Sequence, residues 1–153
     1  MMQRWIAIGV VTILLICGGG FFAYRNYKQN RPQPMWVPLP INPELPAEKR
    51  TEVAKQLKEK LSKPEVLIQV SKDLGLPGKL GLPSDEAAAE EVSKTLFVNV
   101  GEADSPMGTR VPSINVGVRG KSKDHEISGK IAMRLMDDVW KILGIKQPVK
   151  KEF

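Results

Sequence analysis

The chain has 153 residues, a formal net charge of +6 and a single cysteine, Cys17. One cysteine excludes an internal disulfide. The positive charge does not indicate a nucleic-acid partner, because lysines alternate with acids in segments such as AEKRTEVAKQLKEK. That pattern is typical of a solvated helix face. The locally basic RNYKQNR and VKKEF also lack the interleaved aromatic side chains of a nucleic-acid platform.

The first element is an uncharged run from Trp5 to Tyr24. About 20 helical residues span about 30 Å, the hydrocarbon thickness of a bilayer. The run is longer than the apolar core of about 7 to 15 residues in a cleavable signal. Trp5 and Tyr24, with Arg4 and Arg25 outside them, match the interfacial anchors of a spanning helix. We therefore predict a retained signal anchor over residues 1–24.

Two alternatives compete with a retained anchor. One is a cleaved signal, and the other is lipoprotein processing at Cys17, which Gly18 follows. Such processing favours a small residue directly before the cysteine, where this chain has Ile16. A cysteine that packs as a small apolar residue is the simpler interpretation. Charges at the two ends of the run, counted literally, lean slightly towards a cytoplasmic domain.

Residues 25–46 are rich in proline. Proline forbids a helix interior and is tolerated in extended or edge-strand paths. We predict a stiff spacer here, with one possible edge strand.

Residues 47–145 show the patterns of a folded domain. The spacing of Val53, Leu57 and Leu61 predicts an amphipathic helix over 47–62. Ser62 and Glu65 form a capping-box pattern that would start a second helix, which Gly75 and Pro77 end. The repeat LGLPGKLGLP is interpreted as a connector.

The second half of this region alternates differently. Ser84 is expected to cap a third helix that carries early acids. LFVNVG and VPSINVGVRG alternate apolar and polar residues, which predicts an antiparallel strand pair. Asp124 is expected to cap a last helix that ends at Gly144. The predicted fold class is α+β: an N-terminal transmembrane helix, then a small antiparallel sheet packed on three to four helices. Residues 146–153 form a basic tail.

Catalytic chemistry finds little support in the residues. His125, the only histidine, has no Cys or second His with which to share a metal. Glu102 and Asp104 lie beside Ser105 and Gly108, where a turn is the simpler interpretation than a cation site. No nucleotide-binding glycine loop and no nucleophile set is visible. We predict no enzyme, and no catalytic, cofactor-binding or metal-binding residues.

The segments LSKPEVLIQVSKDLGLPGKL, SDEAAAEEVSKTL, LFVNVG, VPSINVGV and KDHEISGKIAMRLMDDV follow one another between about Lys60 and Leu143. In pattern and order this region resembles the chain-length determinant domain of polysaccharide co-polymerases, the Wzz-type proteins. The resemblance implies an inner-membrane protein with a periplasmic domain that oligomerises around growing polysaccharide and sets polymer length.

The resemblance leads to the expected function. We expect a single-pass membrane protein of surface polysaccharide (lipopolysaccharide or exopolysaccharide) biosynthesis or export. Its expected partners are the membrane, other polysaccharide-assembly or envelope proteins and, as a possible homo-oligomer, further copies of itself. The alternative is a structural assembly component of a secretion or surface-fibre machine.

Overall fold

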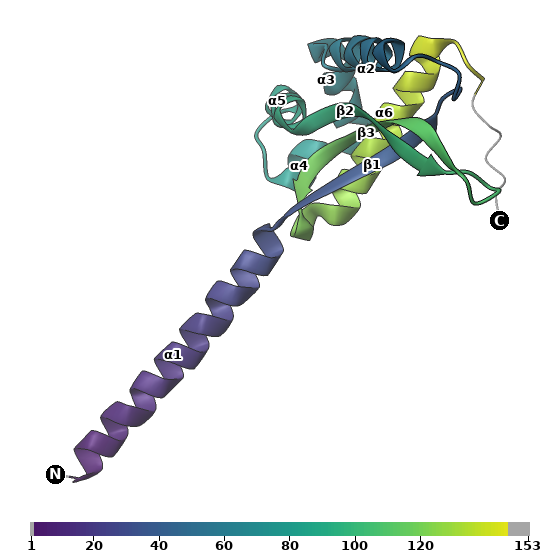
Figure 1. The fold of residues 1–153 in the computed structure, drawn as a ribbon. Coiled ribbons are helices and arrows are strands. Elements are labelled where there is room, and N and C mark those ends of the chain that lie inside the picture. Colours follow the sequence, from purple (N-terminus) through teal and green to yellow (C-terminus); the bar gives the residue numbers. More distant parts are fainter. Residues whose placement is uncertain (1, 147–153) are drawn as a thin grey trace.

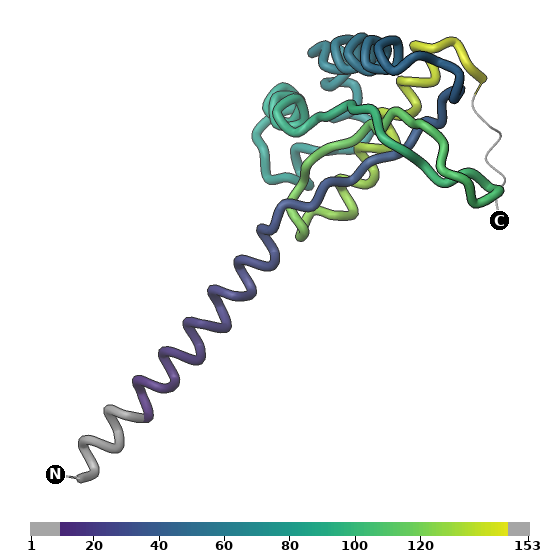
Figure 2. The backbone as a smooth tube through the Cα atoms, in the orientation of Figure 1, coloured from purple at the N-terminus to yellow at the C-terminus, as the bar shows by residue number. Residues whose placement is uncertain are grey.

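The computed structural model describes residues 2–146, with side chains from Val10 onward. The chain opens with one long helix, α1 (Met2–Asn30), which stands apart from the remaining elements, and these form one domain (Figures 1 and 2). The domain contains β1 (Pro32–Pro40), α2 (Ala47–Leu61), α3 (Pro64–Leu74), α4 (Leu76–Leu80), α5 (Asp85–Thr95), β2 (Leu96–Asp104), β3 (Arg110–Lys121), η1 (Ser122–Asp124) and α6 (His125–Leu143).

Helix α1 projects away from the domain, as Figure 1 shows. Its stretch Val10–Asn30 has a mean hydropathy of 1.2, and no part of its apolar window is buried inside the protein. It is therefore long and apolar enough to cross a membrane. Trp5, one of the two predicted interfacial anchors, lies outside the residues whose side chains the structure describes. The helix continues past Tyr24 to Asn30, so the first part of the predicted spacer is helical.

Only Arg31 separates α1 from β1. The Arg31 carbonyl accepts a hydrogen bond of 2.9 Å from the backbone N–H of Ser122, which directly follows β3. The sheet therefore begins within one residue of the end of α1. The possible edge strand of the sequence interpretation is β1.

The sheet has the order β1-β3-β2, and both pairings are antiparallel. In one row across it, Trp36 lies opposite Gly117, and Gly117 lies opposite Phe97. The sequence pattern predicted the antiparallel β2 and β3 pair, which is confirmed. Both strands are longer than predicted, because the hairpin loop shrinks to a turn from Ser105 to Thr109.

The prolines of β1 occupy the positions whose backbone N–H would face away from the sheet. In an antiparallel ladder the N–H and C=O of one residue point to the same side, and this side alternates along the strand. The N–H of Ile41 donates to Pro112 in β3 at 3.0 Å, so odd-numbered residues face β3. The even-numbered Pro32, Pro34, Pro38 and Pro40 therefore face outward, and Trp36 alone in β1 offers an outward N–H. Such an edge resists pairing with another strand.

All the helices of the domain contribute to a core on one face of the sheet. The sheet supplies alternate residues, Leu39, Leu96, Ile114, Val116 and Val118. Helix α6 lies against β1 and β3, and α2 lies against β2 (Figure 1). Burial of these alternate side chains is what fixes the register of the strands. The predicted α+β class, with helices on one sheet face, is confirmed.

The two predicted helix caps at Ser84 and Ser62 had different outcomes. Ser84 caps α5, because its side chain accepts a hydrogen bond from the Ala87 N–H at 3.2 Å. The capping box at Ser62 was wrong: Ser62 ends α2, and α3 starts after Lys63 with Pro64 in its first turn and no side-chain cap. Proline at the first helical position lacks one of the N–H groups that a helix start leaves without an intrahelical partner.

Two further differences concern α6 and the LGLP connector. Asp124 precedes α6 but makes no capping hydrogen bond, because η1 supplies a preceding turn of helix. The connector was expected to be irregular, yet α4 forms within it between two glycines, Gly75 and Gly81, in left-handed conformation. Leu76 of this short helix is fully buried. That burial explains why the segment is ordered by packing and not by helix propensity.

Candidate interaction surface

The sheet face opposite the helices is the candidate site, and we call it the open face. Its side chains alternate with the core residues and take no part in the hydrophobic core. Trp36, the central residue of β1, leaves 49% of its surface exposed. The open face consists of Pro34, Trp36 and Pro38 of β1, Phe97, Asn99 and Gly101 of β2, and Asn115, Gly117 and Arg119 of β3.

Gly117 sets the close approach of β1 to β3 at Trp36. A Cβ atom at Gly117 would lie 2.7 Å from both Cα and Cβ of Trp36, and it would also collide with the Met35 carbonyl oxygen. Only glycine fits this position without moving the strand. The middle of the row between Trp36 and Phe97 therefore carries no side chain, and Gly117 itself is buried.

The side chains beside this row are held in place. The Arg119 guanidinium lies over the Phe97 ring, 5.5 Å from its centroid. A cation–π contact at an exposed site is worth about 0.5 to 1 kcal/mol. The Ser113 hydroxyl donates to Asn115 Oδ1 at 3.0 Å. Asn115 in turn lies against Gly101, where a Cβ would meet its amide.

A hollow of about 350 Å³ adjoins Trp36 near the β2-β3 hairpin, lined by Trp36, Pro38, Glu102, Ala103, Asp104 and Arg110. Arg110 pairs with Glu102 at 3.5 Å. The surface thus combines an exposed aromatic plane with carboxylate, guanidinium and amide groups. This combination can stack against an apolar ring face and hydrogen bond to hydroxyl groups, the two faces that a sugar presents.

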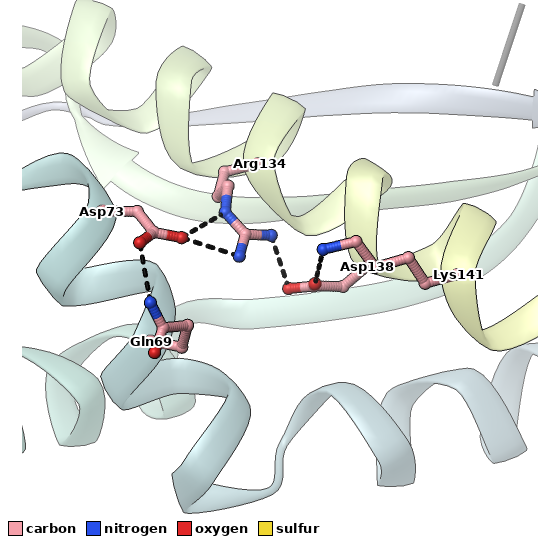
Figure 3. A network of polar contacts seen from close by, with 5 residues as sticks. All are labelled: Gln69, Asp73, Arg134, Asp138 and Lys141. Atoms are coloured by element: carbon pink, nitrogen blue, oxygen red, sulfur yellow. Dashed lines mark hydrogen bonds and ion pairs between the residues drawn. The ribbon is translucent and has the colours of Figure 1, made fainter.

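Apart from the open face, a cluster of polar side chains lies between α3 and α6 (Figure 3). Arg134 Nε and Nη2 donate to Asp73 Oδ2 at 2.9 and 2.8 Å, and Gln69 Nε2 donates to Asp73 Oδ1 at 2.7 Å. Arg134 Nη1 also pairs with Asp138 Oδ2 at 2.8 Å, and Lys141 lies 3.8 Å from Asp138. This cluster ties two helices together, and its carboxylates are engaged by protein cations.

The charges of this cluster support one another. The hydrogen bonds from Arg134 and then from Gln69 lower the pKa of Asp73 below its usual value. Burial opposes the charge of Arg134, but hydrogen bonds to Asp138 and Asp73 outweigh it and raise the pKa of the guanidinium. Both shifts favour the ionised forms of Asp73 and Arg134.

The residues weighed for chemistry in the sequence lie apart. His125 is the exposed first residue of α6, and Cys17 is exposed on α1. Glu102 pairs with Arg110, and Ser105 closes the predicted turn: its N–H donates to the Thr109 carbonyl at 2.8 Å. Among residues 2–146, no group of three or more His, Cys, Asp or Glu side chains lies close enough to hold a metal ion.

No protein-family model, curated protein or solved structure matches this chain.

Sequence reasoning did not identify the open face, because it treated Trp36 as part of a spacer. The signal was nonetheless present in PQPMWVPLP. Prolines at every second position except one indicate an edge strand whose proline positions, which have no N–H donor, face away from the sheet. The exception, Trp36, is the central residue of that strand. Arg119 and Phe97 lie 22 positions apart and gave no such signal.

Proposed function

We propose that this protein is a single-pass inner-membrane protein whose domain faces the periplasm and acts in surface polysaccharide biosynthesis or export, with regulation of chain length as its specific task. It works by binding and not by catalysis. The observation that carries the proposal is the exposed Trp36 at the centre of the open face, on a domain held one residue from a helix able to cross a membrane.

Two arguments support the polymer as the ligand. The region from about Lys60 to Leu143 resembles the chain-length determinant domain in the order of its segments. Independently, the open face offers an exposed indole, an Arg119 and Phe97 pair, and the amides of Asn99 and Asn115. Aromatic and amide groups at a shallow surface suit a long polar chain that must bind and then move on.

A homo-oligomer is part of the proposal, and β2 is the edge it would use. The outward positions of β2 are even-numbered, from Leu96 to Asp104, and none of them is proline. Val100 among them is 38% exposed. This edge keeps the outward N–H donors that β1 lacks.

The first experiment is deletion of the gene, followed by gel separation of the cell's surface polysaccharide. We expect a changed length distribution or amount, restored by the wild-type gene but not by Trp36→Ala. Met107→Ala is the matched control, since Met107 is a 93% exposed apolar residue in the hairpin turn. An unchanged polysaccharide in the deletion strain would reject this function and favour a structural component of a secretion or surface-fibre machine.

The second experiment tests the topology. A reporter that is active only outside the cytoplasm is fused after Phe153, and activity is expected. A cytoplasmic signal would reject the periplasmic domain, and the polysaccharide proposal with it. The size of the mature chain on a denaturing protein gel shows whether residues 1–24 are retained. Cys17→Ser should leave the membrane fraction of the protein unchanged.

A further inference from the structure

A cavity of about 650 Å³ lies at the end of the domain where α1 joins it. Its wall includes Asn30, the last residue of α1, and Pro32, the first residue of β1. The end of β3, η1 and the start of α6 form one side, and α4 and α5 form the other. Figure 1 shows α4 at the end of the domain that α1 approaches.

The cavity has an apolar floor and a cationic rim. The floor is made by Leu80, Leu82, Val92, Val118, Ile127 and Ile131. Three lysines, Lys79, Lys121 and Lys123, line it against two carboxylates, Glu91 and Asp124. Arg119 also lines it, but its guanidinium lies over the Phe97 ring on the open face. Lys121 and Lys123 are exposed, and neither forms an ion pair in the described part of the chain.

The position of the cavity relative to a bilayer follows from the helix. Asn30 lies six residues beyond Tyr24, the end of the uncharged run, which is about 9 Å along the helix axis. The headgroup region of one leaflet is about 5 to 8 Å thick. If the span is taken instead as Val10–Asn30, the cavity begins at the hydrocarbon boundary itself. The two placements bracket the headgroup region, which holds the lipid phosphates.

We propose that this cavity binds the headgroup and glycerol backbone of an anionic phospholipid from the membrane that α1 crosses. The lysines of β3 and η1 would bind the phosphate, while the apolar floor covers the glycerol and the first carbons of the chains. The volume lies within the range of small-molecule pockets. This inference rests on the membrane-spanning part of the proposed function and is independent of polysaccharide.

The test uses the full chain in nonionic detergent, titrated with phosphatidylglycerol or with phosphatidylcholine of the same acyl chains, and native mass spectrometry of the complexes. We expect tighter binding of phosphatidylglycerol. Each cation near a lipid surface contributes a factor of about five, so the double variant Lys121→Gln/Lys123→Gln should bind it about 25-fold more weakly. Circular dichroism and thermal unfolding of this double variant check that the domain remains folded.

The matched control is Lys55→Gln/Lys58→Gln, which removes the same charge from the exposed face of α2. It should keep the wild-type preference. Equal loss in both double variants, or no preference in the wild type, would overturn the inference. Displacement of phosphatidylglycerol by millimolar inorganic phosphate would also overturn it, because the site would then select a free anion.

Insertion is measured separately, by flotation of the full chain with phosphatidylcholine vesicles. A chain that does not float contradicts the spanning helix of the proposed function. A chain that floats but shows no preference for phosphatidylglycerol contradicts the cavity alone.

Discussion

Trp36 lies directly opposite Gly117, and the β1 backbone approaches so closely there that no Cβ atom fits on the glycine. The exposed indole at the centre of the open face therefore depends on a residue with no side chain.

We predict that Gly117→Ala destabilises the protein by about 2 kcal/mol or more, because the added methyl must push β1 away from β3. Gly78→Ala is the control, since a Cβ there meets nothing within 4 Å. Chemical denaturation of both variants measures the difference. Equal stability of the two variants would contradict the close approach.

Arg134→Leu removes the cation between α3 and α6. Asp138, whose side chain is 15% exposed, then loses its partner at 2.8 Å. Asp138 then keeps only the longer contact to Lys141 at 3.8 Å, and a largely buried charge paired so weakly costs about 2 kcal/mol. We expect a lower Tm in a thermal unfolding experiment. Lys130→Leu, which breaks only a solvent-exposed pair with Glu126, should change the Tm by no more than about 2 °C.

The lowered pKa of Asp73, caused first by Arg134 and then by Gln69, gives a pH dependence with a definite sign. A carboxyl with a depressed folded-state pKa stabilises the protein above its unfolded pKa of about 3.9 and loses this contribution as the pH falls through the folded-state value. Asp73→Asn should therefore be less stable than the wild type at pH 7, and the two unfolding curves should converge in strong acid. A constant gap between them at every pH would show that Asp73 does not act through its charge.

Pro34→Val/Pro38→Val would restore two outward N–H groups on β1. We expect increased self-association, because the edge then resembles an ordinary exposed strand. Chemical cross-linking of the full chain in detergent measures it. Pro43→Val, which lies between β1 and α2, is the control and should behave as the wild type.

Much of the fold followed from periodicity. Val53, Leu57 and Leu61 mark α2, and Ile127, Ile131 and Leu135 mark α6, because helix faces repeat at three to four residues. Caps were harder to predict. Ser84 caps α5, but Ser62 does not cap α3, because a proline one position into α3 makes the preceding lysine the boundary.

The site depended on contacts that sequence spacing does not contain. Lys79, Val92 and Lys121 line one cavity although they come from α4, α5 and the end of β3. Arg134 and Asp73 are 61 residues apart. Such pairs are set by how helices cross the sheet, which depends on packing of the whole core.

Arg31 is the only residue between a helix able to cross a bilayer and the first strand of the sheet. A junction this short transmits the tilt of the helix to the domain. Helices respond to the thickness of the hydrocarbon layer by changing their tilt. The composition of the lipid around α1 would therefore set the angle at which Trp36 faces the space beyond the membrane.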